Sequence, residues 1–245
     1  MAVLEVALEE SGYGPVSVLH DVALAVEEGE IVVVLGANGV GKTTLLRTIS
    51  GVVVQSRGRI VFDGRDVSRM AAHRRARAGI VHVPEGRHVF PRLTVAENLR
   101  MGAYAARRSD GAADGYDRVY RLFPFLAKRA GDKASALSGG QQQMLAIARG
   151  LMANPRLLMI DEGSLGLSPV LTEQVFDSLV AIREHGTPIL MVEQNARAAL
   201  AVADRAYVID RGRVTLSGRA AELIDDELMA GVYLGSTIPS PAGRH

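Results

Sequence analysis

The segment that begins at Gly36 fits the phosphate-binding pattern G-x-x-x-x-G-K-[ST]. Its residues are Gly36-Ala37-Asn38-Gly39-Val40-Gly41-Lys42-Thr43. Glycines let the backbone curl until several amide groups point at phosphate oxygens, and a helix starting near Lys42 adds its positive end. Lys42 supplies a point charge for the β- and γ-phosphates, while the Thr43 hydroxyl is a hard oxygen ligand for Mg²⁺. Thr44 is either one more phosphate contact or plain helix surface.

Two adjacent acids, Asp161 and Glu162, follow the apolar run Leu157–Ile160. Neighbouring side chains of a strand face opposite sides, so the two carboxylates serve one site only if the strand ends there. Asp161 is then placed to hold Mg²⁺, and Glu162 to accept a hydrogen bond from an attacking water. Two acids at a strand end are often merely solvated, but beside a phosphate loop they predict phosphoryl-transfer chemistry.

A third segment, Leu137-Ser138-Gly139-Gly140-Gln141, precedes a helical pattern with one apolar face. Ser138 is a good N-cap, and the glycines expose amides at a positive helix end. One interpretation is a capped helix with a flexible entry, and the other is a second anion site. One triphosphate needs one phosphate loop, so a second site makes sense if two chains pair head to tail and complete each other's nucleotide sites.

The elements that must position these residues alternate between short β-branched runs and helical patterns, which predicts a parallel sheet covered by helices. The expected strands are Glu30–Leu35, Gly79–Val83, Leu157–Asp161, Pro188–Val192 and Ala206–Asp210. The main expected helices are Lys42–Ser50, Gln141–Ala153 and Leu171–Glu184. An antiparallel sheet beside this core is expected from Val3–Leu8, Val18–Val26 and Arg59–Phe62. Thr94–Glu97 is interpreted as a helix capping box.

The composition is that of a globular protein: 245 residues, 48% hydrophobic and 22% charged, with a net charge of +1. Near-neutral charge argues against a general nucleic-acid or membrane-surface binder. The Arg-rich stretch 65–92 is interpreted as a solvated surface beside a membrane partner rather than a nucleic-acid or lipid site. The sequence has no cysteine, no apolar run near the about 18 residues of a membrane span and no basic leader region, so we expect a cytoplasmic protein.

In this order, Gly36–Thr43, Leu137–Gln141 and Leu157–Glu162 resemble the ATP-binding cassette (ABC) family, over a region from about Val3 to Leu234. The resemblance implies an α/β P-loop NTPase: a RecA-like, mostly parallel core, an antiparallel β subdomain (mostly 1–30 and 57–64) and a helical subdomain (about 85–150). These form a single domain, 1–234, before a flexible tail at 235–245. The resemblance to the ABC family also implies ATP and Mg²⁺ as cofactors, ATP hydrolysis, and an ATP-sandwich homo- or heterodimer. That dimer would sit on integral permease subunits at the cytoplasmic face of the membrane, with a substrate-binding protein as an indirect partner and no nucleic acid.

The resemblance assigns roles to single positions. The ATP contacts would be Gly36–Thr44 of one chain and Ser138, Gly139, Gly140 and Gln141 of the other. Tyr13 resembles the aromatic residue that stacks on adenine, although a tyrosine in a glycine-rich turn is the plainer interpretation. The catalytic set would be Lys42, Glu162 and Gln194, and the metal set Thr43, Asp161 and Glu85.

Three positions depart from the family pattern. Glu85 stands where most cassettes have glutamine, and Gln194 where most have a switch histidine, so a mechanism that needs that histidine as acid or base is in doubt. Gly163 replaces a proline and is expected to loosen the loop at Ser164–Leu167, which resembles the segment that touches the partner's site.

This sequence resembles the branched-chain amino acid importer ATPases at Val83–Phe90, Leu93–Leu99 and Ser164–Pro169. Glu and Gln are usual in that group at the positions of Glu85 and Gln194. That cargo, or a related amino acid, is therefore the main hypothesis. A urea importer or lipid exporter ATPase is the alternative. Two further alternatives fit the sequence less well. A non-transport cassette usually has paired cassettes or a long coiled coil, whereas this sequence has one phosphate loop and no heptad stretch. A P-loop kinase or GTPase would not need Leu137–Gln141.

Overall fold

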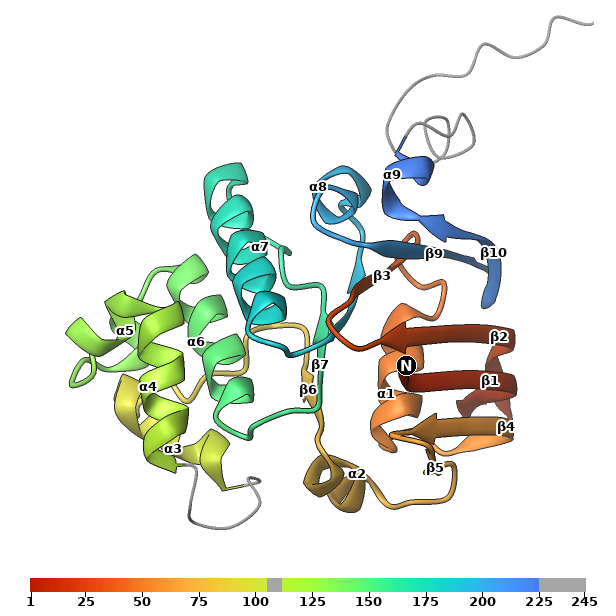
Figure 1. Ribbon diagram of the computed structural model, residues 1–245, viewed down its shortest axis with the longest axis horizontal. Helices are drawn as coiled ribbons and strands as arrows, with labels where there is room; N and C mark the ends of the chain where they lie inside the picture. Colours follow the sequence, from red (N-terminus) through yellow and green to blue (C-terminus); the bar gives the residue numbers. More distant parts are fainter. Residues whose placement is uncertain (105–111, 225–245) are drawn as a thin grey trace, which may run out of the picture.

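The computed structural model describes residues 1–104 and 112–224, and the expected tail at 235–245 lies outside them. Figure 1 shows a central sheet with helices gathered on one side and a second sheet on the other. No helix within the described ranges is long and apolar enough to cross a membrane.

The central sheet has six strands in the order β10-β9-β3-β8-β7-β6. They are β3 (Ile31–Leu35), β6 (Ile80–Val83), β7 (Leu157–Asp161), β8 (Ile189–Glu193), β9 (Arg205–Asp210) and β10 (Arg213–Arg219). All neighbours pair in parallel except β9 and β10. β3, β7 and β8 are buried at every residue, which explains their unbroken apolar runs. The mostly parallel core is therefore confirmed, with the expected strands within one residue of their observed ends.

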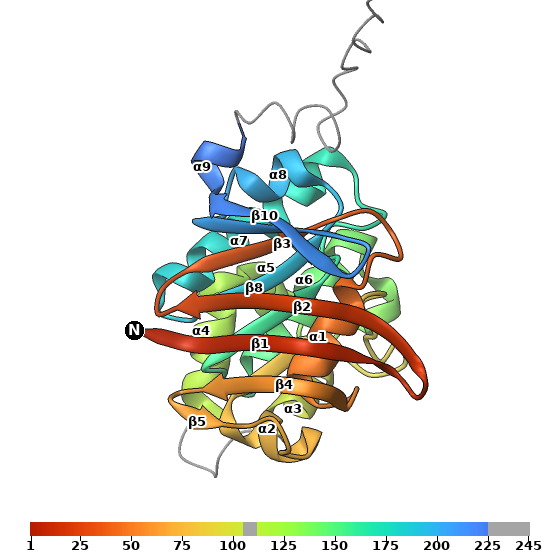
Figure 2. The same ribbon diagram turned by 90° about the vertical axis from the view of Figure 1, so that its right-hand side faces the viewer.

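A four-stranded antiparallel sheet, in the order β2-β1-β4-β5, lies across helix α1 (Lys42–Ser50) in Figure 2. Its strands are β1 (Ala2–Tyr13), β2 (Val16–Glu27), β4 (Gln55–Phe62) and β5 (Arg65–Asp66). β1 alternates between buried residues such as Val6 and exposed ones such as Glu5, so one face is apolar. That face packs with Leu45 of α1 and Val32 of β3 in one hydrophobic cluster.

A group of helices lies on the other side of the parallel sheet from α1 (Figure 1). They are α3 (Val95–Ala103), α4 (Ala112–Leu122), α5 (Pro124–Lys128), α6 (Gly139–Leu151) and α7 (Pro169–Glu184). Leu145 of α6 and Phe176 of α7 share a hydrophobic cluster with Val33 of β3. Shorter elements complete the described chain: α2 (Ala72–Ala78), a 3₁₀ turn (Ala134–Ala136), α8 (Ala196–Leu200) and α9 (Ala220–Leu223).

Two capping boxes fix the starts of helices α3 and α6. Thr94 and Glu97 cap α3 as expected. Ser138 and Gln141 form the same arrangement on α6, which therefore begins at Gly139, two residues earlier than expected. The expected capped helix is confirmed, with Gly139 and Gly140 in its first turn rather than before it.

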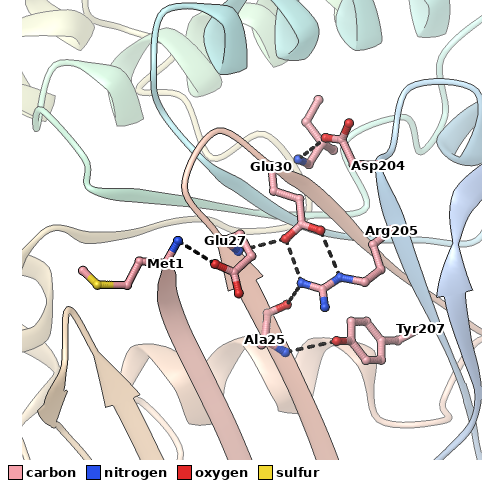
Figure 3. Close-up of polar contacts among 8 residues, drawn as sticks. Met1, Ala25, Glu27, Glu30, Asp204, Arg205 and Tyr207 are labelled. Carbon is pink, nitrogen blue, oxygen red and sulfur yellow. Dashed lines mark hydrogen bonds and ion pairs between the residues drawn. The ribbon is translucent and has the colours of Figure 1, made fainter.

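The amino ends of β3 and β9 are joined by an ion-pair network (Figure 3). The Glu30 carboxylate accepts hydrogen bonds from Arg205 Nε at 2.9 Å and Nη2 at 2.8 Å. Arg205 also donates to the Ala25 carbonyl of β2, while the Tyr207 hydroxyl accepts from the Ala25 amide. The network ties the antiparallel sheet to the parallel one, at the end of the core away from the candidate site.

Candidate functional site

The phosphate-loop residues connect β3 to α1 through glycines that no other residue can easily replace. Gly39 and Gly41 have φ of 81° and 111°, a region that favours glycine. A Cβ at Gly36 would lie 2.5 Å from the Ile209 carbonyl oxygen. The N-cap of α1 is Gly41 and no side chain caps the helix, so its first amides are free of side-chain acceptors. The loop thus offers amides and a positive helix end to an anion.

Lys42 is buried, with its ammonium group folded back over the loop. Its Nζ donates to the carbonyls of Gly36 at 2.8 Å and Ala37 at 3.0 Å. The same atom lies 3.1 Å from Glu162 Oε1. Two residues 120 positions apart in the chain are therefore paired, which brings the phosphate loop and the carboxylate pair together.

Thr43 and Asp161 are also in contact, with the Thr43 hydroxyl donating to Asp161 Oδ1 at 3.1 Å. Asp161 is only 1% exposed. Burial raises its pKa to about 6, with repulsion from Glu162 and Glu85 adding to the shift and the Thr43 hydrogen bond opposing it. Burial disfavours the ionised form of Asp161, and a neighbouring cation would stabilise it. The Thr43 hydroxyl and the Asp161 carboxylate are oxygen donors of the kind that bind Mg²⁺.

The remaining candidates lie where neighbouring parallel strands end. Glu85 follows β6 and is exposed, and Gln194 follows β8 and is exposed. Because the carboxyl ends of parallel strands share one edge, both lie on the same edge as Asp161 and Glu162. No group of three or more His, Cys, Asp or Glu side chains in the described residues is arranged to hold a metal ion.

The Ser138–Gln141 segment lies at the start of α6, on the face of the sheet opposite α1 (Figure 1). The next turn of α6, through Gln142 and Gln143, lines a cavity of about 280 Å³ together with Glu162. Lys42, Thr43, Asp161 and Glu162 are thus assembled within one chain. Within the described residues, no hydrogen bond or ion pair joins the Ser138–Gln141 segment to them.

Tyr13 ends β1 and is 44% exposed. Its hydroxyl accepts a hydrogen bond from Arg47 Nη1 at 3.3 Å. Arg47 belongs to α1, five residues after Lys42, so the ring stands beside the helix that carries the phosphate loop. An exposed aromatic ring in this place is available for stacking.

A family model described as ABC transporter matches residues 19–164. The chain belongs to the ABC transporter family. It is 44% identical over 223 residues to the high-affinity branched-chain amino acid transport ATP-binding protein BraG of Pseudomonas aeruginosa, covering 91% of this chain and 95% of that one. It is 36% identical over 226 residues to a probable branched-chain amino acid transport ATP-binding protein, LivF, of Archaeoglobus fulgidus, covering 92% and 95%.

Other ABC relatives carry a different cargo in their names. The lipopolysaccharide export system ATP-binding protein LptB of Escherichia coli is 36% identical over 220 residues, covering 89% of this chain and 91% of that one. The crystal structure of a nucleotide-free ATP-binding cassette from an ABC transporter superposes with a TM-score of 0.85 at 25% identity, covering 98% of this chain and 100% of that one. This ABC protein is an ATP-binding and ATP-hydrolysing subunit with the cassette fold.

Sequence analysis missed a buried acid beside the site of this ABC ATPase. Glu193 ends β8 and is 2% exposed. Its two carboxylate oxygens accept hydrogen bonds from the Ser164 amide at 3.0 Å and the Ser164 hydroxyl at 2.8 Å. Burial raises its pKa to about 7, against the effect of those bonds. The available sign was an acid directly after the apolar run Ile189–Val192, the same pattern that drew attention to Asp161.

Glu162 has an unusual backbone. Its φ is +47°, in the left-handed region that non-glycine residues seldom adopt. The Glu162 amide donates to the Val192 carbonyl at 3.0 Å, and its carbonyl accepts from the Leu165 amide at 3.2 Å. Such conformations persist only where surrounding contacts hold them, and they concentrate at functional sites.

Proposed function

We propose that the chain is the ATPase subunit of an ABC importer for branched-chain or related amino acids. The 44% identity to BraG over nearly both chains supports this cargo. Lipid export is the alternative with a specific observation behind it, the 36% identity to LptB. A urea importer ATPase is a further alternative. A non-transport cassette fits less well, because this sequence has a single phosphate loop.

The assembled residues divide the work of hydrolysis. The amides of Gly36–Thr44 and Lys42 bind the triphosphate, and Tyr13 stacks on the base. Thr43, Asp161 and Glu85 would hold Mg²⁺, which would neutralise charge on the β- and γ-phosphates. Glu162 is the residue that accepts a hydrogen bond from the attacking water. Gln194 donates a hydrogen bond toward the γ-phosphate, and it takes up no proton near neutral pH.

The contacts of Lys42 suggest how ATP would free Glu162 to act on water. Lys42 is bound to Glu162 and to its own loop. A bound γ-phosphate competes for Lys42, because a dianionic group attracts the ammonium more strongly than one carboxylate. Drawing Lys42 away leaves the Glu162 carboxylate as the free acceptor for water.

Ser138, Gly139, Gly140 and Gln141 complete the site of a second ABC subunit, which makes the active unit a dimer. Their place at the capped start of α6 supports this arrangement. In the part of the chain that the structure describes, Asp161 and Glu162 contact the phosphate loop, whereas no hydrogen bond or ion pair joins this segment to it. Whether the second subunit is identical or a homologue does not alter the chemistry.

A groove of about 940 Å³ lies beside β6 and is the proposed seat of a helix from an integral permease subunit. Exposed apolar side chains at this groove include Val52, Phe90 and Met101. Basic side chains at its walls include Arg47, His73 and Arg149. An apolar helix with an acidic end fits this lining, and such docking would place the subunit at the cytoplasmic face of the membrane.

Two measurements test the proposal. ATP hydrolysis per mole of protein should rise with protein concentration if two chains complete the site, whereas a monomeric ATPase would show constant specific activity. Lys42→Ala is the control and should abolish hydrolysis.

For the cargo, the tagged chain should co-purify from host membranes with a permease and a binding protein that binds leucine, isoleucine or valine. Recovery of a urea-binding or lipid-export partner would overturn the amino acid assignment.

A further inference from the structure

The turn that carries Glu162 joins the ends of two neighbouring strands. Glu162 directly follows β7, and the next strand in the sheet, β8, ends at Glu193. The left-handed backbone of Glu162 is intrinsically unfavourable, so the direction of its carboxylate depends on what restrains the turn.

The two restraints on this turn from β8 come from consecutive residues. The Val192 carbonyl accepts from the Glu162 amide, and the Glu193 carboxylate accepts from both the amide and the hydroxyl of Ser164. Glu193 thus uses both oxygens on one residue, two positions after Glu162. Its near-complete burial strengthens those bonds, because little water competes for the carboxylate.

We propose that Glu193 is a positioning residue, which holds Ser164 so that the Glu162 carboxylate keeps the place from which it orients water. The inference rests on the proposed role of Glu162. Gln194, the predicted γ-phosphate contact, directly follows Glu193 in the chain. Glu193 therefore lies between that position and the turn after β7, which its side chain holds through Ser164.

Gly163 lies close to both the end of β7 and the Glu193 side chain. A Cβ there would lie 3.0 Å from Ile160 Cγ2 and 3.8 Å from Glu193 Oε1. The turn is thus packed directly against the strand end and the buried acid. Where sequence reasoning expected glycine to loosen the loop, the Glu193–Ser164 bonds supply a restraint that does not depend on a proline.

The test compares Glu193→Ala, Glu193→Gln and Ser164→Ala in the full-length protein, measuring kcat and KM for ATP per nucleotide-binding site. Glu193→Ala should lower kcat about tenfold with KM changed less than about twofold, because the loss is in alignment. Glu193→Gln should recover most of kcat, since its amide can accept from the Ser164 amide and donate to the hydroxyl. Ser164→Ala keeps the backbone bond and should lose about threefold.

The matched control is Glu30→Ala, which removes an equally well bonded carboxylate at the opposite end of the sheet. It should lower thermal stability and leave kcat per site unchanged. The inference is overturned if Glu193→Ala leaves kcat per site unchanged, or if Gln fails to recover activity that Ala loses. Should Glu193→Ala not fold, an unchanged kcat in Ser164→Ala overturns it. An unmodified protein that hydrolyses no ATP would instead overturn the proposed function itself.

Discussion

The two ends of the parallel sheet differ in how far the charges of their acidic side chains are compensated. At the amino end, Glu30 is paired with Arg205, and Asp204 accepts a hydrogen bond from the Ile31 amide (Figure 3). At the carboxyl end, Lys42 pairs with Glu162, but Asp161 and Glu193 are buried with raised pKa values, and neither forms an ion pair within the described residues. The paired acids at the amino end stabilise the fold. The buried acids at the carboxyl end carry negative charge that a bound cation could compensate.

Replacing Asp161 by Asn should separate these roles most strongly. ATP hydrolysis is expected to fall by about 100-fold or more, because the metal loses an anionic ligand. The raised pKa means that the ionised Asp161 costs stability, a cost that appears as pH rises from about 4 and is complete above about 6. Asn should therefore raise the melting temperature at pH 8, measured by calorimetry without nucleotide, and not at pH 4. A lower melting temperature at pH 8 would contradict the account.

Proton competition at Asp161 gives a second, smaller effect. Its pKa of about 6 lies within reach of mild acid, so protons should compete with Mg²⁺ there. The Mg²⁺ concentration for half-maximal ATP hydrolysis should rise up to about tenfold for each pH unit below 6. Titrations of Mg²⁺ at pH 7.5, 6.0 and 5.5 measure this, and a constant midpoint would show that Asp161 does not contribute to the metal site.

The two capping boxes offer a matched pair for the smallest effect. Thr94→Ala and Ser138→Ala remove the same kind of hydrogen bond and should each cost about 1 kcal/mol of unfolding free energy in urea. Only Ser138→Ala should also weaken ATP hydrolysis, by several-fold, since Ser138 is proposed to contact nucleotide on the second subunit. Equal activity in the two variants would leave Ser138 as a helix cap alone.

Much of this arrangement follows from residue patterns. Unbroken apolar runs predicted β3, β7 and β8, because a strand covered on both faces needs no polar side. The pattern from Gly36 to Thr43 and the pair Asp161–Glu162 predicted residues that prove to be in contact through Lys42 and Thr43. The spacing of phosphate loops is local, and it is recognisable in one sequence.

What the sequence did not reveal are contacts between distant residues. The Glu193–Ser164 bonds join positions 29 apart, and neither residue type indicates which distant residue it will contact. The left-handed Glu162 is equally hidden, since no glycine marks it. The start of α6 was placed too late because Gly139 and Gly140 have low helix propensity, and the capping box overrides that preference.

The central claim is that the carboxyl end performs chemistry while the amino end provides stability. It is tested most directly by measuring kcat for ATP and the melting temperature of Glu162→Gln beside those of Glu30→Gln. Glu162→Gln should retain ATP binding and lose about 100-fold or more in kcat, under conditions in which the variant is still folded. Glu30→Gln should cost about 1–3 kcal/mol in stability and keep its kcat. Normal turnover by Glu162→Gln would contradict the account.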